Sequence, residues 1–226
     1  MTRNSKNMKE HNHKVVNYFD RAAVTFDTFY DHKRTKFMQW VDKKLRSDVF
    51  DRYYRTFETL EPLTDKTVLD IGCGSGPYVV EAAKLGSKRV VGLDMAQNML
   101  DLARKRAIAA NVADKCEFVL GTFPQDAPAE KFDYSITMGV MDYVPDPRNF
   151  LRALAKQVTD RAVLSFPSKH WFRTPLRKFR YWLKRCPVYF YEPKQIEELS
   201  KAAGFSDLKI EKILGAGMDY FVTLYV

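Results

Sequence analysis

Hydrophobic positions from Lys66 onward alternate between two spacings. Short apolar runs typical of buried parallel strands are separated by segments in which apolar residues recur every three or four positions, as on one face of a helix. Five strands are predicted at 67–71, 89–94, 116–120, 132–138 and 161–166, and three helices at 77–85, 97–110 and 147–157. Strands alternating with helices predict a parallel, doubly wound sheet.

Two further patterns flank this alternation. Apolar residues at helical spacing run from Val15 to Phe29 and again from Phe37 to Phe57, which predicts two amphipathic helices within residues 1–62. They form either an N-terminal helical cover over a ligand site or an ordinary packing extension. At the other end, a helix over 193–203 precedes strands at 207–213 and 219–226, whose short connection requires antiparallel pairing. The expected fold of residues 63–226 is therefore α/β and Rossmann-like, with a mostly parallel seven-stranded sheet that ends in an antiparallel hairpin.

Composition narrows the class of protein. The 226 residues are 46% hydrophobic, which suffices for a sizeable core. Three widely spaced cysteines, Cys73, Cys116 and Cys186, indicate a reducing compartment and predict neither a disulfide framework nor a metal site. We find no apolar run typical of a secretory signal or a membrane span, so we expect a cytoplasmic protein.

The net charge of +9 is concentrated in one stretch. Residues 169–185 contain seven basic side chains and no acid. Thr174-Pro175 starts a helix there and Pro187 stops it, with Arg177, Arg180 and Lys184 beside an apolar face. Such a face favours an anionic partner, although a charged helix is also compatible with simple solvation.

A glycine-rich turn follows the first strand. The run Val68-Leu69-Asp70-Ile71-Gly72-Cys73-Gly74-Ser75-Gly76 ends an apolar strand in a carboxylate and three alternate glycines. Its G-x-G-x-G spacing differs from the G-x-G-x-x-G of dinucleotide sites. The carboxylate two residues ahead of the turn favours a ligand with positive charge.

The run from Asp70 to Gly76 resembles motif I of class I S-adenosylmethionine-dependent methyltransferases, and Val90 to Met95 resembles their second strand. The resemblance implies that Asp94 binds the ribose and Met95 packs on the adenine. It places Gly72, Met138 and Gly139 around the methionine end, and adds Asp70, Cys73, Gly74, Gly76, Thr122 and Phe123 to the cofactor site. Thr122 stands where many relatives carry an acid that accepts from the adenine amino group.

A candidate catalytic residue lies in the loop after the fourth strand. Tyr143 stands where many small-molecule O-methyltransferases of this class have a histidine, so a histidine base is not expected at that position. We expect Tyr143 and Tyr30 on either side of the methyl path, where their hydroxyls orient a carboxylate or act on a phenol. Ordinary packing is the alternative for both tyrosines.

The flanks of the chain loosely resemble magnesium-protoporphyrin O-methyltransferases. This resemblance implies a small anionic or aromatic acceptor and a basic capping insertion at 169–191, with His170, Arg177, Arg180, Lys184, Tyr189 and Tyr191 near the substrate. Two alternatives stay open: a nucleic-acid (RNA) methyltransferase, and a non-catalytic cofactor-binding module that docks to a membrane surface or RNA. Against a base methyltransferase, no Asn-Pro-Pro-Tyr or Asp-Pro-Pro-Tyr motif follows the fourth strand.

Overall fold

The computed structural model describes residues 15–16, 47–169, 188–213 and 219–226. Within these residues lies one seven-stranded sheet with the order β3-β2-β1-β4-β5-β7-β6. Its strands are β1 (Thr67–Ile71), β2 (Arg89–Asp94), β3 (Cys116–Leu120), β4 (Phe132–Thr137), β5 (Val158–Phe166), β6 (Asp207–Lys212) and β7 (Tyr220–Tyr225). All pairs are parallel except those of β7, which runs antiparallel to both of its neighbours. The predicted architecture is confirmed.

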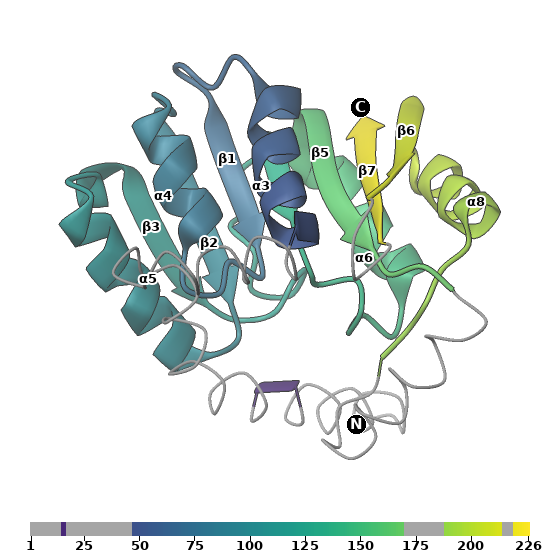
Figure 1. The fold of residues 1–226 in the computed structure, drawn as a ribbon, viewed down its shortest axis with the longest axis horizontal. Helices are drawn as coiled ribbons and strands as arrows, with labels where there is room; N and C mark the ends of the chain where they lie inside the picture. Colours follow the sequence, from purple (N-terminus) through teal and green to yellow (C-terminus); the bar gives the residue numbers. More distant parts are fainter. Residues whose placement is uncertain (1–14, 17–46, 170–187, 214–218) are drawn as a thin grey trace.

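Helices cover both faces of the sheet (Figure 1). On one face lie α3 (Ser47–Leu60), α4 (Pro77–Lys84) and α5 (Gln97–Ala109). On the other lie α6 (Pro147–Gln157) and α8 (Pro193–Ala203), and η1 (Ala113–Lys115) is a short turn before β3. Pro77 and Pro147 begin their helices, and the Asp146 side chain accepts a hydrogen bond from the Asn149 amide at 3.2 Å.

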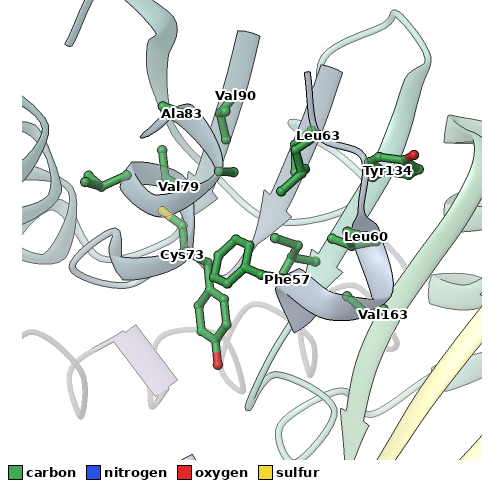
Figure 2. Packing of buried hydrophobic residues seen from close by; sticks show 14 of the residues in the cluster. Phe57, Leu60, Leu63, Cys73, Val79, Ala83, Val90, Tyr134 and Val163 are labelled. Carbon is green, nitrogen blue, oxygen red and sulfur yellow. The ribbon is translucent and has the colours of Figure 1, made fainter. Parts of the chain in front are cut away.

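The core is divided by the sheet into two hydrophobic clusters. On the α3 side, Phe57 and Leu60 pack with Val79 of α4 and with Tyr134 and Val163 of the sheet (Figure 2). This packing attaches α3, which lies in the predicted N-terminal cover, to the face that α4 and α5 share. The opposite cluster joins Leu69 and Leu164 of the sheet to α6 and α8.

Several boundaries differ from the sequence-based expectation by one residue, and two differ by more. The strand β5 starts at Val158, directly after α6, where we expected residue 161. Val158 pairs with Phe132 across a register shift in β4, so three further residues join the strand. The helix α3 continues to Leu60, beyond Phe57, the last residue of the apolar pattern that predicted it.

Candidate functional site

The carboxyl ends of the parallel strands bring the predicted cofactor residues to one edge of the sheet. Asp70 pairs in register with Gly92 of β2 and with Ile136 of β4, and Asp94 pairs with Leu120 of β3. In open α/β sheets this edge is where ligands bind.

The glycine turn after β1 has the left-handed backbone that its sequence requires. Gly72, Gly74 and Gly76 have φ angles of 72°, 53° and 77°. A Cβ atom on Gly76 would lie 2.8 Å from the Cβ of Ala103 in α5, so glycine lets α5 pack closely there. At Gly74 no atom of the other described residues lies within 4 Å of the Cβ position, so within this part of the chain the backbone is open to a ligand.

Asp94 joins the end of β2 to this turn. Its Oδ2 accepts a hydrogen bond from the Gly74 amide at 2.8 Å, and its Oδ1 accepts from the Ala96 amide at 2.9 Å. The amides of Gly72 and Cys73 donate to the Leu93 carbonyl at 2.7 and 3.1 Å. These four bonds fix the carboxylate of Asp94 beside the turn.

Asp70 is a buried carboxylate, only 1% exposed, and its Oδ2 has no hydrogen-bond partner among the described residues. Burial, and secondly the charge of Asp94, raise the pKa of Asp70 well above its ordinary value. Burial likewise raises the pKa of the Cys73 thiol, which keeps this sulfur protonated and unreactive. Two carboxyl groups so placed favour a cationic ligand.

The loop after β3 contains an acid that the sequence analysis did not single out. The Thr122 amide donates to Oδ2 of Asp126 at 2.8 Å, and the Thr122 hydroxyl donates to the same oxygen at 3.1 Å. The Phe123 ring packs on Phe150 of α6, with ring centroids 4.8 Å apart. Thr122 is therefore next to a carboxylate, although no acid occupies its own position.

The loop after β4 packs against the glycine turn. A Cβ atom on Gly72 would lie 2.3 Å from the Val140 side chain, so only glycine permits this approach. Gly139 has a φ of 74°, and its Cβ position has no neighbour within 4 Å in the described part of the chain. Its amide donates to the Ser165 hydroxyl at 2.7 Å. Met138 packs against the cluster on the α3 side.

Tyr143 lies in a small hydrophobic cluster that joins four segments of the chain. Val15 is 4% exposed and packs with Met95, Tyr143 and Val188. The candidate adenine contact and the candidate catalytic tyrosine therefore share one cluster with the N-terminal segment. Tyr30 lies outside the described residues.

The two tyrosines of the predicted insertion differ in setting. Tyr191 is 3% exposed, its ring packs edge-on against Phe166, and its hydroxyl donates to the Val144 carbonyl at 3.5 Å. Tyr189 is half-buried, and its amide donates to the Asp142 carbonyl at 2.8 Å. Burial raises the pKa of both hydroxyls. His170, Arg177, Arg180 and Lys184 lie outside the described part of the chain.

A family model described as "Methyltransferase domain" matches residues 63–189, which is more than half of the chain. The chain belongs to this family. Its first matched residue coincides with the predicted start of the sheet domain, and the resemblance that the glycine turn and Asp94 indicated is confirmed.

Similar proteins include O-methyltransferases. The chain is 38% identical over 105 residues to a ubiquinone biosynthesis O-methyltransferase of Neisseria meningitidis serogroup A, covering 46% of this chain and 44% of that protein. It thus spans less than half the length of the first curated relatives that it matches. It is 29% identical to a magnesium-protoporphyrin O-methyltransferase of Rhodobacter capsulatus, over 88% of this chain and 89% of that one.

A solved structure shares the fold over nearly the whole chain. It is magnesium protoporphyrin IX methyltransferase from Synechocystis PCC 6803 with bound SAH, with a TM-score of 0.78 and 20% identity, covering 95% of this chain and 99% of that one. At this level of identity the likeness shows a shared fold.

The described residues provide neither a cluster of metal ligands nor a membrane-spanning helix. They contain no group of three or more His, Cys, Asp or Glu side chains that could hold a metal ion. Within the same residues, no helix combines the length and the apolar character needed to cross a membrane.

Proposed function

We propose that this chain is an S-adenosylmethionine-dependent O-methyltransferase that acts on a small anionic or aromatic acceptor. The observation that carries the proposal is the hydrogen bond from the Gly74 amide to Asp94. It brings a glycine turn that is open to a ligand and a fixed carboxylate into one site, and the family and the named relatives support the same activity.

The residues present fit the cofactor. Asp70 provides a buried carboxyl oxygen without a described partner, and no described residue fills the Cβ positions of Gly74 and Gly139. Asp94 would accept from the ribose hydroxyls and Met95 would pack on the adenine. The remaining proposed cofactor residues surround the methionine end or the adenine: Asp70, Gly72, Cys73, Gly74, Gly76, Thr122, Phe123, Met138 and Gly139.

Asp126 is our candidate acceptor for the amino group of the adenine. Its carboxylate is held by two bonds from Thr122, next to the carboxyl end of β3. It therefore supplies the acidic acceptor that position 122 lacks.

Bound S-adenosylmethionine would supply a methyl group on a sulfonium, with the C–S bond breaking as the acceptor oxygen forms the new C–O bond. The chain's part is positioning and exclusion of water, because such a displacement needs alignment more than covalent help. The acidic side chains of Asp70 and Asp94 would favour a cofactor that carries positive charge. A carboxylate acceptor is ionised at neutral pH and requires no base.

Tyr143, and Tyr30 from the N-terminal segment, would orient the acceptor. Tyr191 has a positioning role in this proposal, because its hydroxyl donates to the Val144 carbonyl, one residue from Tyr143. The packing of Val15 against Met95, Tyr143 and Val188 supports an N-terminal cover, residues 1–62, that lies on a methyltransferase domain, residues 63–226. The insertion at 169–191 would supply His170, Arg177, Arg180, Lys184 and Tyr189 to the acceptor.

Calorimetry with S-adenosylhomocysteine and NAD tests the cofactor. We expect micromolar or tighter binding of S-adenosylhomocysteine and weaker binding of NAD. The converse order would refute the proposal. A screen of carboxylated and phenolic acceptors with methyl-labelled S-adenosylmethionine then identifies the acceptor, and label recovered only on nitrogen or carbon would refute O-methylation.

The basic segment 169–185 also supports a second candidate, a methyltransferase acting on RNA, or a peripheral membrane contact. A polyanion that displaces several counterions binds with a steep dependence on salt, whereas a small carboxylate does not. Binding of generic RNA, DNA and anionic vesicles over a salt series separates these partners. Salt-dependent binding that disappears when Arg177, Arg180 and Lys184 are neutralised would favour the second candidate.

The free thiols Cys73 and Cys116 support the proposed cytoplasmic location.

A further inference from the structure

Ser165 connects four elements at the carboxyl edge of the sheet. It is 1% exposed, and its hydroxyl oxygen accepts from the Gly139 amide at 2.7 Å and from Nη1 of Arg52 at 3.5 Å. The same Arg52 nitrogen lies 3.8 Å from Oδ2 of Asp219, just before β7. The hydroxyl thus links the loop after β4 to β5, to α3 and to the start of β7.

The hydrogen bonds fix where the Ser165 oxygen points. A serine hydroxyl has two acceptor sites, and the two N–H donors address both. Arg52 is itself held by the charge of Asp219, with side chains that are 16% and 9% exposed. The oxygen is consequently held in the orientation that accepts from Gly139.

The orientation of the Gly139 amide decides the orientation of the Met138 carbonyl. The two groups belong to one planar trans peptide, so they point in opposite directions. Strand β4 lies between β5 and β1. Because the amide points toward Ser165 on β5, the carbonyl points toward the β1 side, where Asp70 and the glycine turn lie.

A glycine after this peptide makes its orientation easy to change. Gly139 has a φ of 74°, and no described residue lies within 4 Å of its Cβ position. Because glycine adopts positive and negative φ angles about equally well, its backbone is compatible with either orientation of this peptide. The hydrogen bond to Ser165 therefore selects one of two available orientations.

We propose that Ser165, supported by Arg52 and Asp219, is a positioning residue that directs the Met138 carbonyl toward the ammonium group of the cofactor's methionine end. This inference rests on the proposed function, since it needs S-adenosylmethionine in the site. Ser165 itself does not touch the cofactor.

The test compares two ligands that differ at the methionine end. S-adenosylhomocysteine carries the ammonium group, whereas 5′-methylthioadenosine lacks the amino-acid portion. By calorimetry, Ser165→Ala should weaken S-adenosylhomocysteine binding by about threefold to tenfold, as expected for one neutral hydrogen bond, and leave 5′-methylthioadenosine binding unchanged. Ser165→Thr retains the hydroxyl and should restore the parent ratio of affinities.

Ser135→Ala is the matched control. Ser135 is buried on the neighbouring strand β4, and its hydroxyl has no hydrogen-bond partner among the described residues. The substitution removes the same atom from the same sheet and should leave the ratio of the two affinities unchanged.

If Ser165→Ala does not fold, Arg52→Gln tests the same contacts, because Arg52 on α3 donates to the Ser165 hydroxyl. We then expect a smaller loss of affinity that affects S-adenosylhomocysteine and not 5′-methylthioadenosine. Equal losses for both ligands, or no loss, would overturn the inference. Failure of the parent protein to bind either ligand would instead refute the proposed function. The two failures are therefore distinguishable.

Discussion

Replacing Asp94 with asparagine tests the contact on which the proposed cofactor site depends. The carboxylate of Asp94 accepts from the Gly74 amide at 2.8 Å through one oxygen and from the Ala96 amide at 2.9 Å through the other. An asparagine offers one acceptor oxygen and turns an NH₂ group toward the second amide. One of the two backbone donors consequently loses its partner.

The magnitude follows from the charge of the group. A hydrogen bond to an ionised acceptor contributes about 1.5 to 3 kcal/mol, so the variant without ligand should lose about that much stability. For a chain of this size we expect a fall in Tm of about 3 to 12 °C. Weakened acceptance from the ribose should raise the Kd for S-adenosylhomocysteine by about 10-fold to 150-fold, by the same energy range.

Calorimetry at neutral pH measures this Kd, and a thermal melt measures the stability. Asp101→Asn is the matched control, because Asp101 lies on the exposed face of α5, 52% exposed, in an ion pair with Arg104. The control should change neither quantity by more than a surface substitution does. A folded Asp94→Asn variant with the parent's affinity would refute the assignment of Asp94 to the cofactor.

Three further predictions concern neighbouring positions. The raised pKa of Asp70 means that the folded state holds the carboxyl proton more tightly than the unfolded state does. The stability of the parent should therefore fall as pH rises from about 4 through the raised pKa. In thermal melts over a pH series, Asp70→Asn should abolish that fall, and the same pH dependence in both proteins would contradict the prediction. At Gly76 an added Cβ meets a side chain of α5 at 2.8 Å, whereas at Gly204 no described residue lies near the added atom, and both glycines have a positive φ. Gly76→Ala should therefore lower the free energy of unfolding in urea melts by more than Gly204→Ala does. Equal losses would contradict the close packing. With a carboxylate acceptor, Tyr143→Phe should raise the activation free energy of turnover by about 0.5 to 1.5 kcal/mol. With a phenol it should reduce the rate by about 10²-fold to 10⁴-fold, and the control Tyr54→Phe, at an exposed position, should do neither. Unchanged turnover would make Tyr143 a packing residue.

Most of the fold could be predicted because the signals are local. Apolar runs identified β1 to β3 with their observed ends, and proline and glycine marked the two ends of α8. The start of β5 was missed because Thr159 and Asp160 are polar and no turn residue separates them from α6. Only the pairing of Val158 with Phe132, a non-local contact, makes this segment a strand.

The site divides in the same way. The glycine turn and Asp94 were found because their spacing along the chain is itself the pattern. Ser165 and Arg52 were not, since they are 113 positions apart and neither lies in a motif. Asp126 stands four residues after Thr122, a spacing that a turn favours, but many loops contain such a pair.

The residues that precede the segment 170–187 contact the residues that follow it. Ser168 forms a bridge with Tyr191, the Lys169 amide donates to the Tyr191 carbonyl at 3.2 Å, and the Lys169 ammonium lies 3.0 Å from Glu192. Because the flanking residues hold the two ends of this segment together, the segment can be exchanged without changing how the strands pair. Evolution or engineering can therefore replace the segment at this junction, which in our proposal contacts the acceptor, while the strands that would hold the cofactor keep their sequence.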